Sequence, residues 1–382
     1  MRSAGAALLG ILLAVAGAVE ARAQDGPGGP TSIAVPAQWT TPPGAQPLVR
    51  SPLAPARRGY DIRADRWAPL GPVEKRDEWL LAQPKMTLPA VSPDPIAQGR
   101  WQVKFHIDRG SDFGWDQSVP GETPADRRFL VDGEHQTTEV SLRYGLYPRL
   151  AVGIRVPIHW RGAGFMDGPI DWFHELTEPI GFLDNGRPAF TNDSYRVEGR
   201  QPDGTPISWT DERGTGLGNI ELEAYWNFQA PCSRSDWRAA VIARVGLPTG
   251  SDPYDTGGVD FGLQVVAAKQ VAHRWDFYMG VGGTFFGDTT QDGIEYERVR
   301  AHAFFAFEYA IDPCHRLLVE TNAASRLVKN LASYPGLSWY INVALKVKVS
   351  RAFELEVGFT ENLEDQQGTI DFGGFAGFTL TL

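Results

Sequence analysis

The stretch Arg149–Trp160 reads RLAVGIRVPIHW and decides the fold of this 382-residue chain. Its apolar residues recur at every second position, so that Leu150 and Val152 share one side while Arg155 and His159 lie on the other. Successive side chains of a β-strand point to opposite faces. Strict alternation therefore predicts a strand with one apolar face and one polar face.

The same alternation recurs from residue 99 to the C-terminus. We expect strands near residues 99–108, 137–146, 149–160, 217–228, 237–247, 259–270, 274–286, 294–310, 314–326, 336–348, 351–361 and 369–382. About twelve such strands are typical of an all-β fold, the transmembrane antiparallel β-barrel, whose apolar face meets lipid. A soluble β-sandwich also alternates, but aromatic residues at strand ends, such as Trp101, Trp160 and Trp339, favour the aromatic girdles of a membrane barrel.

The connections between these segments alternate in length. One end of the barrel should carry tight turns at 147–148, 271–273, 312–313 and 350–351, and a slightly longer one around 231–232. The other end should carry the connections 109–136, 161–216, 248–258, 287–293, 327–335 and 362–368. Short periplasmic turns and long outer loops are the pattern of bacterial outer-membrane barrels. An even strand count places both ends of the barrel sequence on the periplasmic side.

The N-terminal quarter has a different composition. Residues 1–23 combine Arg2, an apolar run and small residues, which predicts a secretory signal peptide cleaved before Gln24. Residues 24–95 are rich in proline and predict a periplasmic linker or a segment that caps the barrel. For its second half, ordered packing into the barrel or over its periplasmic mouth and a loose tether both stay open. The barrel itself is expected at 96–382, in the bacterial outer membrane.

Composition narrows the choice of partners. The formal net charge of −10 gives no basic surface for nucleic acid, and the Cys and His spacing of a metal site is missing, so we expect no nucleic-acid partner, metal or cofactor. The two cysteines, Cys232 and Cys314, each follow a proline and fall in turns at the same barrel end. In an exported protein they could form a disulfide, with two free thiols as the alternative.

Charged residues occupy the polar face of the strands, and we expect them to line the lumen. They are Arg143, Arg155, His159, Glu221, Glu223, Arg244, Lys346, Lys348, Glu354 and Glu356. Opposite charges fall on neighbouring strands, because the turn at 350–351 sets Lys348 against Glu354 and Lys346 against Glu356. A balanced lumen of this kind fits a structural filling. The functional alternative is a narrow pore of mixed selectivity, since a selective filter would need a ring of one sign.

The long connection 161–216 is the most distinctive segment. Residues 169–176 predict a short helix with Pro169 at its start. We expect this loop to form a constriction or a recognition segment through Phe165, Asp167, Asp171 and His174. Asp171 and His174 lie one turn apart, so that an acid/base pair or half a metal site is conceivable, but a hydrogen bond that stabilises the loop is favoured.

At this segment the sequence resembles a known family. Residues 164–174, GFMDGPIDWFH, are similar to the shared core of uncharacterised Gram-negative outer-membrane proteins catalogued as a domain of unknown function, and 139–146, 216–220 and 246–250 fit the same pattern. The resemblance runs from about Gly71 to the end. It implies an outer-membrane barrel and no established reaction or ligand. One departure is the C-terminal Leu382, where many such barrels end in an aromatic residue.

Three functions compete on this sequence. The first is a passive channel or transporter for small solutes, with outer-membrane lipid and the barrel assembly machinery as further partners. The second is a plugged barrel with a structural or surface-interaction role. The third is a membrane-embedded lipid hydrolase, but no serine accompanies His106, His159 or His174 in a catalytic motif, so no catalytic residue is assigned.

Overall fold

The computed structural model describes residues 67–76, 79–115, 129–177, 193–201, 203–229, 236–331, 336–363 and 370–382. Twelve long strands form its wall: β1 (Trp101–Trp115), β2 (Phe129–Tyr147), β3 (Leu150–Gly162), β7 (Glu221–Gln229), β8 (Arg238–Gly246), β9 (Asp260–Ala272), β10 (Trp275–Phe285), β13 (Val299–Ala310), β14 (His315–Ser325), β15 (Leu337–Lys348), β16 (Phe353–Asn362) and β17 (Phe372–Thr381). Each corresponds to one predicted segment.

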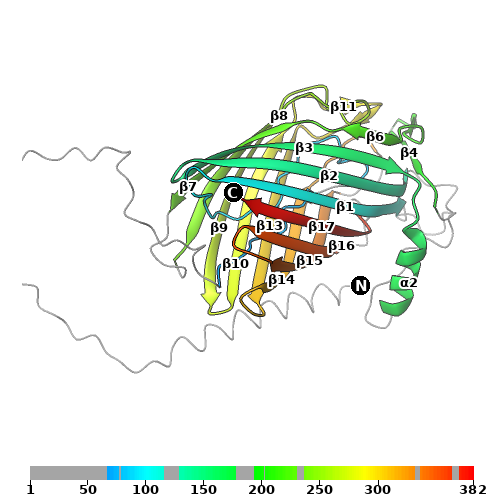
Figure 1. Ribbon diagram of the computed structural model, residues 1–382. Helices are drawn as coiled ribbons and strands as arrows, with labels where there is room; N and C mark the ends of the chain where they lie inside the picture. Colours follow the sequence, from blue (N-terminus) through cyan, green and yellow to red (C-terminus); the bar gives the residue numbers. More distant parts are fainter. Residues whose placement is uncertain are drawn as a thin grey trace, which may run out of the picture. The chain divides into compact units, whose positions relative to one another are not determined.

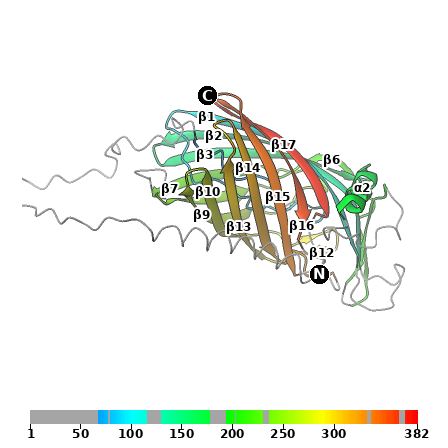
Figure 2. The same cartoon turned by 90° about the horizontal axis from the view of Figure 1, so that it is seen from below.

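The strands close into a barrel. Every neighbouring pair is antiparallel, and β1 pairs with β17 while β2 pairs with β3, so that the ring has no open edge (Figures 1 and 2). The predicted antiparallel barrel of about twelve strands is confirmed. Because all backbone groups of the wall pair within it, such a ring suits a lipid environment. No helix among the described residues is long and apolar enough to cross a membrane.

The register of the strands also agrees with the sequence analysis. Lys346 lies opposite Glu356, Lys348 opposite Glu354, and Glu223 opposite Arg244. Outward-facing positions are exposed and apolar along most strands, whereas the alternate positions are buried inside the ring. The alternation of the sequence therefore corresponds to the two faces of the wall.

Several strands differ from their predicted bounds. β1 and β2 run on past the predicted 99–108 and 137–146, and most of their added residues toward the long-loop end are buried on both faces. The predicted strand 217–228 is divided into β6 (Gly214–Leu217) and β7, and between them Gly218 lies so close to His159 that a Cβ there would meet its ring at 2.4 Å. The irregular strand 294–310 is likewise divided into β12 (Ile294–Glu295) and β13.

Smaller strands and one helix lie at the end of the barrel that carries the long loops. β4 (Arg196–Arg200) pairs with the extended part of β2, and β5 (Pro206–Ser208) pairs with β4. β11 (Thr290–Gln291) forms a small hairpin with β12. Helix α2 (Asp167–Thr177) lies at the rim beyond the ends of β1 and β17 (Figures 1 and 2).

The opposite end carries the short turns. In the turn before β14, hydrogen bonds from the backbone N–H of Cys314 and from the side chain and N–H of His315 lower the pKa of Asp312 to about 2. Cys314 is exposed there. Cys232 lies outside the described residues, as does the predicted signal peptide, so the disulfide and the export signal stay predictions.

The lipid-facing role of the outer wall can be tested with two valines that are each 60% exposed, Val281 in the middle of β10 and Val299 at the start of β13. Val281→Arg is expected to lower the free energy of unfolding in lipid vesicles by about 2–4 kcal/mol, since a charge at the bilayer midplane is poorly solvated. The matched Val299→Arg should cost about 0–1 kcal/mol near the interface. Urea titration measures both, and equal losses would contradict the orientation.

Candidate functional site: the filled lumen

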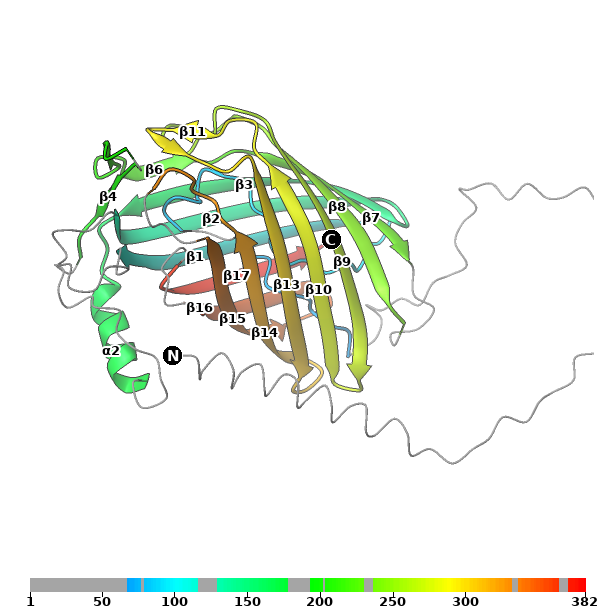
Figure 3. The ribbon, with the colours of Figure 1, turned by 180° about the vertical axis from the view of Figure 1, so that it is seen from behind.

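The lumen is filled by the described part of residues 67–96, which we call the plug. The plug begins at the short-turn end, where the Ala68 carbonyl accepts a hydrogen bond from Arg316 near the start of β14 (3.0 Å). It reaches the long-loop end at Leu80, whose N–H donates to Asp112 near the end of β1 (2.9 Å). It then returns, and Asp94 pairs with Arg238, the first residue of β8 (2.7 Å). In Figures 1 and 3 this light-blue trace runs inside the ring.

The first arm of the plug is held mainly through its backbone. Glu308 accepts the N–H groups of Leu70 and Gly71, both at 2.8 Å, and Glu320 accepts the N–H of Val73 at 2.9 Å. Lys346 donates to the Pro72 carbonyl at 2.7 Å. Buried backbone groups need partners, and here charged side chains of the wall supply them.

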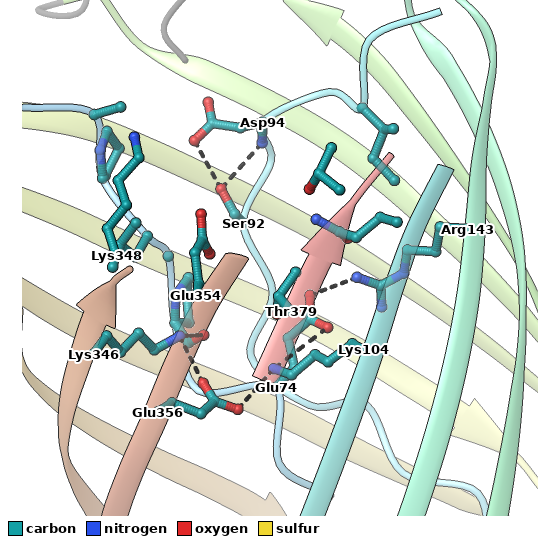
Figure 4. A pocket seen from close by; sticks show the side chains of 18 of the residues that line it. Glu74, Ser92, Asp94, Lys104, Arg143, Lys346, Lys348, Glu354, Glu356 and Thr379 are labelled. Carbon is teal, nitrogen blue, oxygen red and sulfur yellow. Dashed lines mark hydrogen bonds and ion pairs between the residues drawn. The ribbon is translucent and has the colours of Figure 1, made fainter. Parts of the chain in front are cut away.

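Two ion-pair networks join the next plug residues to β1, β2, β3, β7 and β8. Glu74 lies between Arg143 (2.9 Å) and Lys104 (3.9 Å), as Figure 4 shows. Arg143 continues to Glu223 at 2.5 Å, and Glu223 in turn lies 3.3 Å from Arg244. This first network thus joins the plug to four strands of the wall, β1, β2, β7 and β8.

Arg76 belongs to the second network. It binds Glu221 directly and lies 3.9 Å from Glu139, which pairs with Arg155 at 2.5 Å. These side chains are all buried. A buried charge is stable only with a partner, so Arg76 and Glu221 depend on one another.

Apolar contacts add to these polar ones at two levels. Trp79–Ala82 at the tip are buried in a cluster with Phe129, Trp209 and other residues of the long-loop end. Lys85 lies beside this cluster, with its ammonium group 4.4 Å from the ring centre of Tyr296, and burial lowers the pKa of Lys85. Val73, Ala90 and Val91 pack against the small apolar side chains that line the inside of β8–β15.

A cavity of about 130 Å³ remains beside the plug, lined partly by residues of the short-turn end. It is bounded by Glu74, Lys104, Arg143, Lys346 and Glu356, which Figure 4 shows converging from the plug, β1, β2, β15 and β16. Glu356 lies 3.1 Å from Lys104 and 3.0 Å from Lys346. The cavity walls therefore carry both signs of charge.

Comparison with known protein families identifies the family of this chain. The family described as "Protein of unknown function (DUF3187)" matches residues 64–381, which is most of the sequence and includes the plug. The chain belongs to the DUF3187 family. No curated protein matches it.

Solved structures extend the comparison to the fold of this DUF3187 protein. The COG4313 outer membrane channel from Pseudomonas putida F1 is similar with a TM-score of 0.52 at 10% identity, over 76% of this chain and 97% of that one. The NanC porin gives a TM-score of 0.40 at 8% identity, over 74% of this chain and 100% of that one. The P. putida toluene transporter TodX gives 0.37 at 8% identity, over 75% and 89%. The DUF3187 chain therefore has the barrel fold found in outer-membrane channels.

The charged residues predicted to line the lumen lie as follows in this DUF3187 barrel. Buried inside the ring are Arg143, Arg155, His159, Glu221, Glu223, Arg244, Lys346 and Glu356, while Lys348 and Glu354 are partly exposed at the mouth. Their partners include the plug as well as neighbouring strands. The Nδ1 atom of His159 is hydrogen-bonded to the hydroxyl of Thr137 at 2.8 Å.

The predicted loop segment lies elsewhere. Phe165 is 63% exposed and stacks on Arg109, which is on the outward face of β1. Asp167 is buried and accepts the N–H of Asp193 at 2.6 Å. Asp171 is partly exposed, and the side chain of His174 lies outside the described part of the chain. A recognition role for these four residues stays a prediction, and in the described structure the lumen is occupied by the plug instead.

Three residues that hold the first arm of the plug were not predicted from the sequence: Glu308, Arg316 and Glu320. The alternation of β13 and β14 does place them on the inner face, but only the structure shows what they bind. The burial of Arg76 and Glu74 was not predicted either, since nothing in a proline-rich stretch marks a charged residue as buried.

Proposed function

We propose that this chain forms a channel for small solutes in the bacterial outer membrane and that the plug is its gate. One observation carries the proposal. The ring of strands closes through its own pairings, and no described plug residue belongs to a strand. The plug can therefore leave without breaking a hydrogen bond between strands of the wall.

The chemistry of the contacts supports a movable plug. Many of its polar contacts are made to side chains such as Glu308, Lys346 and Arg143, which water can solvate once the plug has moved. Both arms of the plug end at the short-turn side, so that it can withdraw as a loop. The proposal includes export by a cleaved signal peptide, insertion by the barrel assembly machinery and contact with outer-membrane lipid.

A specific observation favours a second function, a permanently plugged barrel with a structural role. Trp79, Leu80 and Leu81 are buried among residues of the long-loop end. Withdrawal would expose this apolar surface to water, and burying a large side chain is worth about 1.5–3 kcal/mol. A gate and a permanent plug can be distinguished by measuring conductance with the plug free and with the plug linked covalently to the wall.

A disulfide between plug and wall is expected to close the channel. A Cβ placed on Gly246 would lie 3.9 Å from the Cβ of Met86, within the range of a disulfide. In a Cys232→Ser/Cys314→Ser background, the pair Met86→Cys/Gly246→Cys should show openings in planar bilayers when reduced. On oxidation the open probability should fall at least about tenfold, because loop closure makes plug release much less favourable.

Two controls interpret this result. Met86→Cys alone should conduct equally under reducing and oxidising conditions. Equal conductance of the oxidised and reduced double variant, with the disulfide verified by mass spectrometry, would contradict a gate formed by the plug. If neither form conducts, and Arg76→Met, which should weaken plug docking, does not conduct either, the permanently plugged barrel is favoured.

A further inference from the structure

The wall holds the plug residues Ala68–Val73 by a pattern of main-chain contacts. Within these six residues, one wall group binds each of the carbonyls of Ala68 and Pro72 and each of the N–H groups of Leu70, Gly71 and Val73. The groups come from the adjacent strands β13, β14 and β15. We call Glu308, Arg316, Glu320 and Lys346 the cradle.

The cradle is organised by the wall itself. Glu308 accepts a hydrogen bond from the Tyr278 hydroxyl at 2.9 Å and lies 3.3 Å from Arg316. One oxygen of Glu320 is held by Asn322 at 2.8 Å and Asn342 at 2.9 Å, while its other oxygen binds the plug. The carboxylates thus stay oriented toward a ligand, and little side-chain entropy is lost when one binds.

The bound segment contributes no charge of its own. Ala-Pro-Leu-Gly-Pro-Val offers only small or apolar side chains, and Val73 packs on the apolar inner wall. The cradle therefore recognises the main chain of an extended segment. It binds the carbonyls at the first and fifth positions and the N–H groups at the third, fourth and sixth. The cavity borders Ala68, Leu70 and Pro72, so that a ligand could reach the cradle through it.

We propose that the cradle is a binding site for extended, uncharged oligopeptides, which compete with plug residues Ala68–Val73. A peptide is the fitting class because two acidic acceptors and two cationic donors are placed to match the N–H and carbonyl groups of one extended main chain. The proposal rests on the proposed function in one respect, since the first arm of the plug must be able to leave the cradle.

The test uses the full chain with a plug that binds the cradle less well. Leu70→Pro/Val73→Pro removes the N–H groups that donate to Glu308 and Glu320, whereas the matched Leu70→Ala/Val73→Ala keeps both. The probe is fluorescein-labelled Ala-Pro-Leu-Gly-Pro-Val amide, and fluorescence anisotropy in detergent micelles measures its binding. We expect saturable binding to the proline variant, and binding at least about tenfold weaker to the alanine variant and to the unchanged chain.

Two further comparisons identify the main chain as the feature that is read. A probe N-methylated at Leu and Val should bind the proline variant at least about tenfold more weakly, whereas Ala-Pro-Ala-Gly-Pro-Ala should bind within about tenfold of the original. Adding Glu308→Gln/Glu320→Gln should also weaken binding by at least about tenfold. If the proline variant does not fold, the unchanged chain with the probe in excess gives the same comparison between methylated and unmethylated peptide.

Undiminished binding of the methylated probe, or undiminished binding to the Glu308→Gln/Glu320→Gln variant, would overturn the proposal, as would no saturable binding at all. The readout is equilibrium binding and needs no ion current. A silent channel that still binds the probe would contradict the gate and leave the cradle in place. A channel that conducts but does not bind the probe would contradict the peptide site and leave the gate in place.

Discussion

Replacement of Arg76 by methionine is expected to open the channel. The Arg76 guanidinium is the plug's partner for Glu221 inside the barrel. Methionine fills similar space but leaves the Glu221 carboxylate buried against an apolar side chain. Breaking a buried pair on one side costs about 3–5 kcal/mol. The substitution destabilises only the state in which the plug is docked, because water can solvate the Glu221 carboxylate once the plug withdraws.

That difference should raise the undocked population between about a hundredfold and a few thousandfold. Single-channel recording in planar bilayers measures it as open probability, and limited proteolysis of residues 67–96 gives an independent measure. Combining Arg76→Met with the oxidised Met86→Cys/Gly246→Cys disulfide should abolish the gain. The double variant Arg76→Met/Glu221→Leu should recover most of the closed state, since exchanging both partners of a buried pair for apolar residues is close to neutral.

An Arg76→Met protein with the conductance and protease resistance of the unchanged chain would show that the ion pair does not hold the plug. Openings that persist with the disulfide formed would show that current passes by another route.

Replacement of Glu223 by leucine is expected to destabilise the whole barrel. Its carboxylate lies 2.5 Å from Arg143 and 3.3 Å from Arg244, and Tyr225 donates a hydrogen bond to it at 3.2 Å. Leucine would leave two buried guanidinium groups, on β2 and on β8, short of a partner. We expect the free energy of unfolding in detergent or vesicles to fall by about 3–5 kcal/mol.

The matched control is Glu354→Leu, at a partly exposed inner position of β16 near the mouth. An exposed pair contributes about 0–1 kcal/mol, so this variant should unfold at nearly the same urea concentration as the unchanged chain. Gel mobility with and without heating reports whether each variant has folded. Equal unfolding midpoints for Glu223→Leu and Glu354→Leu would contradict the role assigned to the buried network.

The wall was predictable because lipid imposes a rule on every strand. A residue such as Val281 must be apolar and its neighbour need not be, so that alternation appears in the sequence at each crossing. The same rule fixed the pairing of Lys346 with Glu356, since a tight turn leaves few possible registers. Strand ends were less predictable, because β1 and β2 continue where both faces are buried and alternation stops.

The contents of the lumen were not predictable in the same way. Ala68–Val73 are bound through their backbone, which every residue carries, so no pattern of side chains marks them as a ligand of Glu308 and Glu320. A proline-rich composition predicts the lack of helix and strand, and the structure agrees, but it does not predict burial. The inward charges were assigned to one another across strands, whereas Glu221 has its closest partner in the plug.

The distance along the chain between the plug and its cradle determines the order of assembly. Glu308, Glu320 and Lys346 stand 238, 247 and 274 positions after the residues they bind. The earliest segment of the barrel unit must therefore wait for strands near the end of the sequence before its contacts exist. During that interval the wall has to be stable while it is still empty. Pairs formed between strands, such as Glu223 with Arg244, already satisfy part of its inner charge and make such a vacant precursor tolerable.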